Sequence, residues 1–451
     1  MDYTIKSSIL FDLGIGRAIT KIIAEKLGKN ELEEIPGLFW TSFFLILSIS
    51  VACAVILFFL SPVFVYKIFN ISQNLQAETL NTFYILALSI PVVTTTASIR
   101  GFLEAYQKFR SISIIRTILG VCSFLVPLIV LFFTKNLFLI VIFLVMVRII
   151  IWILYMSQCF KINSGIKNKF YFKINFIKPI LKLSGWMTVS NITVPIIIYM
   201  DRFIIGAIVS AAAITYYATP YEVVTKLLII PGALTGVLFP TFSATYLNNP
   251  DYTKKLLLKA VKYIFIFLFP IVTLIITFAG EGLNLWLGAE FAQNSSFILR
   301  FLAAGVLINS LTYIPFAFLE GIGRPDITAK VQLIELPFYL FFMWMAIKQA
   351  GIDGAAFAWL TRMVFDSAIL FYFVKKQIAA QFKYKFKMNH LFILILIAAS
   401  IITPFVFDII FKSILALITL LSFSYISWKF LLMEEERVFL LSKLIPNTFS
   451  K

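Results

Sequence analysis

The sequence predicts an all-α polytopic membrane protein, and its composition leads to this fold class. Hydrophobic residues make up 61% of the 451 residues and the mean hydropathy is +0.95, whereas charged residues make up only 14%. A soluble chain carries about 25% charged residues. Apolar runs of about 18 residues or more recur along the whole length, each long enough to cross a hydrocarbon core as a helix. These runs show no polar alternation, which favours helices over a closed barrel.

Thirteen apolar segments are candidates for spanning helices. The first is the least apolar, because five charged residues interrupt it. The expected spans are 8–27, 39–67, 82–104, 112–133, 137–157, 184–207, 218–245, 260–279, 297–320, 328–348, 353–374, 390–407 and 411–432. Two further stretches are expected at the membrane surface: 280–291 on the outer face and 433–445 on the cytoplasmic face.

The net charge of +17 is concentrated in two connectors. Six lysines lie in 158–183 and five in 375–389, whereas 68–81 and 280–296 contain no Lys or Arg. Counting spans places both lysine-rich connectors on one membrane face, which the positive-inside rule makes cytoplasmic. We therefore expect a multi-pass protein of the inner, cytoplasmic membrane with a cytoplasmic C-terminus. Its lysines would contact anionic lipid headgroups and not nucleic acid.

The sequence gives no indication of an enzyme, a metal site or a cofactor. It contains no GxxxxGK[ST], HExxH or GxSxG motif and no connector long enough to fold alone. The cysteines Cys53, Cys122 and Cys159 form no CxxC pair and are expected to be apolar filler. His390, the single histidine, is expected to be an ordinary interfacial side chain.

A short motif occurs twice and suggests an internal repeat. The segment "FLEAYQKFR" begins at Phe102 and "FLEGIGRPD" begins at Phe318, 216 residues later. Each copy ends an apolar segment with a Glu and opens a basic loop. An even number of helices separates them, so the sequence predicts two parallel six-helix repeats, a plan that transporters use with the substrate path between the halves.

The repeat also predicts that the first half lacks its first helix. If the second block opens near Ser184, its counterpart falls before Met1, and 8–27 becomes the second helix of the first block. We expect the upstream coding sequence to encode a further apolar segment. The expected domains are an N-terminal lobe, a basic connector, a C-terminal lobe, a basic linker, an extra helix pair and an interfacial tail, at 1–160, 161–183, 184–376, 377–389, 390–433 and 434–451.

Three segments resemble a known transporter family. They are "FDLGIGRAITKIIAEKLGK" at 11–29, the stretch 201–243 beginning "DRFIIGAIVS", and the stretch 323–366 beginning "GRPDITAKVQLIELP". These are similar to the oligosaccharide flippases of the multidrug/oligosaccharidyl-lipid/polysaccharide exporter superfamily. The resemblance implies a V of two six-helix lobes, a polar cavity, alternating access and a polyprenyl-diphosphate-linked sugar as cargo. The spans 390–407 and 411–432 are similar to the extra pair of fourteen-helix members.

A diphosphate cargo would need cations inside the membrane, where each charge costs a few kcal/mol unless it faces a cavity or a partner. Arginine suits phosphate through its bidentate fork. The substrate-binding candidates are Arg17, Lys21, Arg100, Arg116, Arg148, Lys226 and Arg362. The candidates for ion pairs or ion coupling are Asp12, Glu104, Asp201, Arg202, Glu222, Glu335 and Asp366.

Each candidate has an ordinary structural alternative. Arg17, Lys21 and Arg148 could snorkel to the interface, and Arg100, Glu104 and Arg116 could pair to fix a gate. The i, i+4 spacings of Glu222 with Lys226 and of Arg362 with Asp366 predict intrahelical ion pairs. Glu335 has no cation near it in the sequence, so we expect a coupling-ion site or a protonated carboxyl.

The leading hypothesis is a flippase that translocates a polyprenyl-diphosphate-linked oligosaccharide for surface polysaccharide such as O-antigen. The expected partners are this substrate, membrane lipids, a polysaccharide polymerase and chain-length proteins. Two alternatives from the same superfamily are an ion-coupled exporter of drugs or metabolites and a flippase for a peptidoglycan precursor. A polymerase would need a large external loop, which the sequence lacks.

Overall fold

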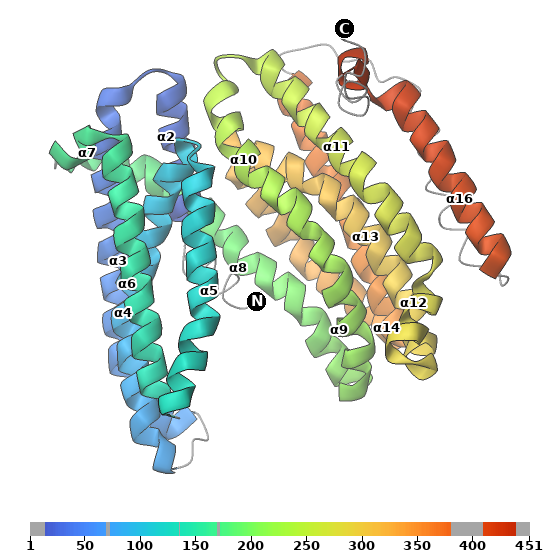
Figure 1. Ribbon diagram of the computed structural model, residues 1–451, viewed down its shortest axis with the longest axis horizontal. Coiled ribbons are helices and arrows are strands. Elements are labelled where there is room, and N and C mark those ends of the chain that lie inside the picture. The colour runs from blue at the N-terminus through green and yellow to red at the C-terminus, as the bar shows by residue number, and fades with distance from the viewer. Residues whose placement is uncertain (1–13, 69–72, 135, 169–171, 380–408, 439–451) are drawn as a thin grey trace, which may run out of the picture. The chain divides into compact units, whose positions relative to one another are not determined.

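The computed structural model is helical throughout the residues that it describes, which are 14–68, 73–134, 136–168, 172–379 and 409–438 (Figure 1). Ten helical stretches in these ranges are long and apolar enough to cross a membrane. In hydrocarbon a backbone must satisfy its own hydrogen bonds, and helices do this locally. The prediction of an all-α polytopic membrane protein is confirmed.

The described residues form two compact units. Unit 1 comprises Met1–Pro195, Gly236–Thr253 and Phe318–Gln332. Unit 2 comprises Ile196–Thr235, Lys254–Ala317 and Leu333–Lys451. Several long helices therefore contribute residues to both units. The domain ranges expected from the sequence, which are continuous, stay a prediction.

The first six long helices begin in unit 1. They are α2 (Ile15–Gly28), α3 (Ile35–Val63), α4 (Gln73–Ala105), α5 (Phe109–Phe133), α6 (Leu137–Ile162) and α8 (Ile177–Ile208), with the short α7 (Ser164–Asn168) before α8. Their core centres on aromatic rings: Phe39 packs edge-on against Trp40 and Phe102, with 5.3 Å between ring centroids in each pair. Edge-to-face packing of this kind adds to the stability that burial gives.

The later helices supply most of unit 2. They are α9 (Ala211–Val224), α10 (Ile229–Thr245), α11 (Pro250–Thr277), α12 (Ala279–Leu287), α13 (Ala289–Gly321), α14 (Pro325–Ala379) and α16 (Ile409–Ile426). A 3-10 turn, Thr225–Leu228, joins α9 to α10 inside the segment that the sequence predicted as one span. The nine-residue α12 occupies the predicted surface stretch 280–291.

Helix α14 contains two spans and a break. Ala350 and Gly351 leave the helical conformation, and Gly351 has φ 57°, which favours a residue without a Cβ. The predicted boundary between 328–348 and 353–374 falls at this break. Thirteen spans were predicted and ten stretches are found, because these two spans are continuous and two others are not counted. Of those two, 8–27 is described only from residue 14, and 390–407 lies outside the described residues together with His390.

Helix bounds recur along the chain at the offset of the repeated motif. Adding 216 to the bounds of α4 gives 289–321, the bounds of α13. The same step takes α5 to 325–349, the part of α14 before its break, and takes α2 to 231–244, inside α10. Because α2 corresponds to α10, α8 lies before the second copy of that helix, which is where the sequence-based count placed it. The plan of two parallel six-helix repeats stays a prediction.

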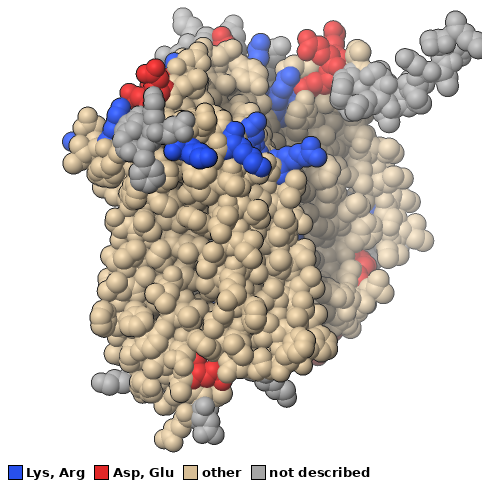
Figure 2. Space-filling model, turned by 60° about the vertical axis from the view of Figure 1, so that its left-hand side comes forward, with Lys and Arg blue, Asp and Glu red and all other residues tan. Residues whose placement is uncertain are grey.

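The helices present apolar side chains to their surroundings. On α5, Leu128, Phe132 and Phe133 are 55%, 81% and 86% exposed, which in water would be unfavourable but suits contact with lipid. Figure 2 shows Lys and Arg gathered in a band near one end of the face in view, next to a broad area without charged side chains. This distribution is typical of a protein that spans a bilayer.

Helix α16 packs against other helices of unit 2 through a narrow stripe of buried residues. Phe423 stacks on Phe269 of α11 with ring centroids 4.3 Å apart. An ion pair lies toward each end: Lys412 Nζ is 2.7 Å from Glu281 of α12, and Lys262 Nζ is 2.5 Å from Glu436, which follows α16. The Tyr263 hydroxyl also donates to Glu436. Burial raises the pKa of Glu436, but these hydrogen bonds outweigh it and lower the pKa to about 2.

Candidate functional site: a buried polar cluster in unit 2

The most unusual chemistry in the described residues is a group of buried charges and tyrosines inside unit 2. Helix α8 supplies Asp201, which is only 1% exposed. Its Oδ1 accepts a hydrogen bond from the Arg202 backbone N–H at 2.7 Å, whereas its Oδ2 has no hydrogen-bond partner among the described residues. An ionisable side chain buried in a membrane span is expensive, so its position points to a function.

Arg202 lies between a carboxylate and two aromatic rings. Its Nη2 donates to Glu222 Oε1 on α9 at 2.8 Å. Its guanidinium also lies 5.5 Å from the centre of the Tyr199 ring and 5.0 Å from that of Tyr221. Arginine binds aromatic faces in this way because the ring face carries partial negative charge. The guanidinium is therefore held in one orientation by three contacts.

Tyrosines form the wall of the cluster. Tyr217 and Tyr221 stack with 6.1 Å between centroids, and Tyr221 meets the Trp359 ring edge-on at 5.7 Å. The buried hydroxyl of Tyr217 lies beside the Asp201 carboxyl, whereas the buried hydroxyl of Tyr339 makes no hydrogen bond to a described residue. Most buried polar atoms in folded proteins are paired, so an unpaired hydroxyl beside charges marks a place for water, an ion or a ligand.

The two halves of α14 contribute a second ion pair. Arg362 Nε lies 3.0 Å from Glu335 Oε1, and the two side chains are only 12% and 11% exposed. The Arg362 guanidinium also lies 5.2 Å from the centre of the Tyr339 ring. The second oxygen of Glu335, Oε2, makes no hydrogen bond within the described part of the chain. Asp366, one turn beyond Arg362, is partly buried.

This geometry changes two of the pairings expected from the sequence and adds a closer partner to a third. Glu335 does have a nearby cation, Arg362, which a distant part of α14 brings to it. Arg362 therefore pairs across the break of α14 and not with Asp366. Glu222 lies 2.8 Å from Arg202 but 4.0 Å from Lys226, because the 3-10 turn after α9 ends the regular i, i+4 geometry.

Unit 1 contains a smaller buried ion pair. Arg17 Nη1 on α2 donates to Glu320 Oε2 at 3.1 Å, and the Glu320 side chain is 2% exposed while that of Arg17 is 45% exposed. Lys21, one turn later, pairs with Glu25. Asp12 lies outside the described residues. Arg17 and Lys21, which were predicted to form a cationic stripe, are thus each paired with a carboxylate.

The remaining predicted cations of unit 1 differ in their surroundings. Arg100 Nε pairs with Glu104 at 3.2 Å, as the sequence suggested, whereas Arg116 is exposed and joins no ion pair with a described residue. Arg148 in α6 is partly buried and has no ion-pair partner among the described residues. Among the predicted substrate-binding residues, Arg148 is thus a cation inside a span without a counter-ion.

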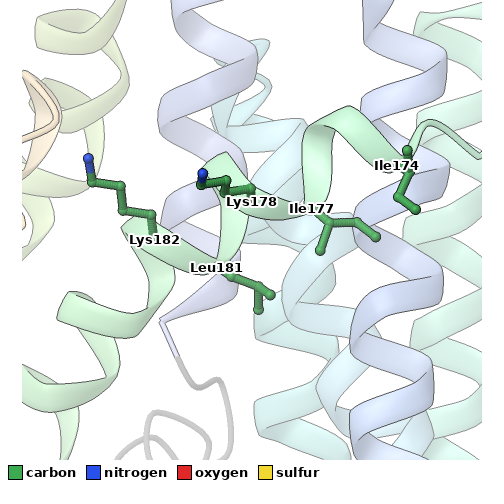
Figure 3. Close-up of a pocket in the computed structure, with 5 residues that line it drawn as sticks. All are labelled: Ile174, Ile177, Lys178, Leu181 and Lys182. Atoms are coloured by element: carbon green, nitrogen blue, oxygen red, sulfur yellow. The ribbon is translucent and has the colours of Figure 1, made fainter.

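An open hollow on unit 1 lies apart from these clusters. Its volume is about 710 Å³, and the residues that line it all precede or begin α8: Ile174, Ile177, Lys178, Leu181 and Lys182. Figure 3 shows the two lysine side chains rising on one side of the helix, with Leu181 and Ile177 pointing to the other. Two lysines above apolar side chains suit a membrane surface. The expected contact of this connector with anionic headgroups stays a prediction.

Sequence reasoning missed Glu320, Tyr217 and Tyr339. Glu320 had a signal, since it is the Glu of the second "FLE" motif and lies 216 residues after Glu104. The tyrosines had none, because 18 Tyr and 49 Phe are spread through the spans and their burial depends on how each helix is rotated.

The fold and the buried charges together define a multi-pass membrane protein with ionisable side chains inside its spans. Solved structures with similar folds include a MOP superfamily transporter from Pyrococcus furiosus, with a TM-score of 0.69, 13% identity and coverage of 84% of this chain and 87% of that one. A MATE transporter in the straight conformation gives a TM-score of 0.74 at 12% identity, over 84% of this chain and 86% of that one. At these identities the likeness concerns the fold alone.

Sequence comparison is more specific. The chain belongs to the polysaccharide biosynthesis protein family, whose pattern matches residues 7–296. It is 30% identical to a Shigella flexneri protein named "Putative O-antigen transporter", over 80% of this chain and 85% of that protein. It is 21% identical to the "Probable low-salt glycan biosynthesis flippase Agl15" of Haloferax volcanii, over 46% of this chain and 44% of that protein.

Proposed function

We propose that this protein is a flippase that moves a polyprenyl-diphosphate-linked oligosaccharide across the cytoplasmic membrane by alternating access, for surface polysaccharide. Family membership and the names of its relatives support this class of cargo. The observation that carries the mechanism is the Arg362–Glu335 pair. It places a guanidinium inside a membrane-spanning unit beside a carboxylate whose second oxygen, Oε2, makes no hydrogen bond to the described residues.

The proposed mechanism is an exchange of partners. A diphosphate offers more negative charge and more oxygen atoms than one carboxylate, so it competes well for the forked donors of arginine. Arg362 would leave Glu335 for the diphosphate when cargo binds. Glu335 would then take up a proton or a cation, because a buried carboxylate without a counter-ion is costly. Loading and release would thus be tied to the charge state of Glu335.

Other cations would contribute at different stages. Arg148 has no counter-ion among the described residues, so it would attract the diphosphate directly. Arg202 stays fixed by Glu222 and the aromatic rings, which suits a supporting role for the tyrosine wall. The Lys226 side chain is 52% exposed and its Nζ lies 4.0 Å from Glu222, so it would add positive charge near this pair.

Complementation of a flippase-null strain tests this proposal. Arg17→Ala, Arg148→Ala and Arg362→Ala should each lower surface polysaccharide by about ten-fold or more per amount of folded protein, and Lys should restore part of the activity at each position. Lys255→Ala is the matched control, because this lysine is exposed and makes no ion pair with a described residue. Wild-type export by all three arginine variants would reject the role of these cations.

A second candidate is export of drugs or metabolites driven by Na⁺ or H⁺. It gains support from the fold likeness to MATE transporters and from the buried carboxylates Glu320 and Asp201. A single flippase-null strain can distinguish the two candidate functions. An exporter would protect the cells against cationic drugs without restoring surface polysaccharide, whereas a flippase would restore surface polysaccharide without protecting against the drugs.

A further inference from the structure

A second group of charges lies in unit 2, on residues that the transport proposal does not use. Lys412 at the start of α16 is 5% exposed, and its Nζ lies 2.7 Å from Glu281 Oε1 on α12. Arg300 on α13 is within electrostatic reach of the same carboxylate. Three helices thus bring two cations to one carboxylate, and Glu281 is the centre of the group.

Arg300 lacks a partner of its own. It is partly buried inside a membrane-spanning helix, yet it forms no ion pair or hydrogen bond with any residue in the described ranges, and its Nε is fully buried. The second oxygen of Glu281 is also buried without a hydrogen bond. A half-buried guanidinium with free donors is a costly arrangement unless something binds it.

The charges of the group sum to +1. Burial raises the pKa of Glu281, but the Lys412 hydrogen bond and the Arg300 charge outweigh it and hold the pKa below its usual value. Glu281 is therefore ionised at neutral pH and compensates only one of the two cations. The remaining positive charge calls for an anion.

The surroundings indicate an anion at the membrane interface. Helix α12 exposes Leu285 and Trp286, at 92% and 60%, and an exposed indole is typical of the headgroup level. Helix α16 exposes Ile414 and Leu417 at 50% and 57%, next to the buried Lys412. A ligand here would meet cations at one end and an apolar surface along the helix.

We propose that Arg300 and Lys412, with Glu281 between them, bind the phosphate of an anionic phospholipid. The forked guanidinium of Arg300 offers two parallel donors to phosphate oxygens, and Lys412 adds charge. Glu281 keeps Lys412 in place and limits the strength of binding. The acyl chains would lie along the exposed face of α16. This site is separate from the Arg362 cluster and does not depend on the nature of the cargo.

The test measures how lipids raise the thermal unfolding midpoint of the purified protein in detergent. The probes are phosphatidylglycerol, phosphatidylcholine with the same acyl chains, a polyprenyl diphosphate and inorganic phosphate. The variants are Arg300→Gln, Glu281→Gln and a control, Lys348→Gln. Lys348 is an exposed cation of α14 whose nearest described partner is the Trp344 ring.

Phosphatidylglycerol should stabilise the wild type and the Lys348→Gln control equally. Arg300→Gln should need about five-fold more of it, because one cation near a membrane surface is worth about that factor in affinity. Glu281→Gln should need less, since the charge of the group rises from +1 to +2. A merely structural role would not make the two variants respond to lipid in opposite directions. If Arg300→Gln does not fold, the response of Glu281→Gln alone tests whether the site binds phosphatidylglycerol.

Several results would overturn the proposal. Equal stabilisation by phosphatidylcholine would show that the charge of the headgroup does not matter. Equal stabilisation by inorganic phosphate would show that the site binds phosphate without needing a lipid. Stabilisation by the polyprenyl diphosphate alone would assign the site to cargo. An unchanged response in both Arg300→Gln and Glu281→Gln would remove these residues from the site.

Discussion

Removing one member of the Arg362–Glu335 pair should damage folding, whereas removing both charges should spare folding and abolish transport. The two charged atoms are 3.0 Å apart and the side chains are nearly buried. At an effective dielectric constant of about 20, their attraction is about 5 kcal/mol before the cost of desolvation. Loss of one partner from a buried pair costs about 3–5 kcal/mol, because the other charge stays buried alone.

Arg362→Gln should therefore lower the free energy of unfolding by about 3 kcal/mol or more. The double variant Arg362→Gln/Glu335→Gln should come within about 1 kcal/mol of the wild type, since no buried charge remains unpaired. Unfolding by SDS in mixed micelles measures both differences. Surface polysaccharide in a flippase-null strain measures transport by the same variants.

The combination of results is decisive. If the double variant folds like the wild type and also exports like it, Arg362 has no part in moving cargo. If Arg362→Gln alone is as stable as the wild type, the pair is not a buried ion pair of the kind described. Glu335→Gln adds a check, because it leaves Arg362 without its carboxylate and should change cargo affinity as well as destabilise the fold.

Three further predictions concern other parts of the molecule. Arg17→Gln should destabilise the protein by about 1–2 kcal/mol, more than Glu320→Gln does, because only the first leaves a buried carboxylate without its cation, although the exposed side of Arg17 weakens the pair. Thermal unfolding of both variants compares them. Gly305→Ala should lower the thermal unfolding midpoint, because the added Cβ would lie 2.3 Å from the buried indole ring of Trp359. The control Gly236→Ala adds a Cβ with no atom within 4 Å, so it should leave the unfolding midpoint unchanged or raise it. Glu436→Gln should be less stable than the wild type at pH 7, and the difference should shrink as pH falls from about 4.5 towards 2, because a carboxyl with a lowered pKa stabilises the fold only while it is ionised. A constant difference across that pH range would contradict the ion pair.

Much of the fold follows from the sequence because membrane helices have a simple signal. Continuous apolar runs can satisfy their backbone groups only as helices, so the spans around α5 and α6 agree with the structure within a few residues at most ends. Gly351 likewise marks the break in α14. The 3-10 turn Thr225–Leu228 was not foreseen, because its residues are as apolar as their neighbours.

The site was harder to predict than the fold. Charged residues inside apolar runs are conspicuous, so Asp201 and Arg362 were identified as candidates from the sequence alone. Their partners were not, because a pairing such as Arg362 with Glu335 depends on the rotation of two helices about their axes. A sequence rule that looks one turn away along the same helix therefore chose Asp366.

The recurrence of helix bounds after 216 residues has a consequence for how this chain can change. One inserted residue turns everything beyond it in a helix by about 100°, which would carry lipid-facing side chains into the packed interior. From α4 to α6 the helices and loops have nearly the same lengths as their counterparts in α13 and α14. Adding or removing a residue inside these helices would therefore disturb the packing far more than replacing one side chain.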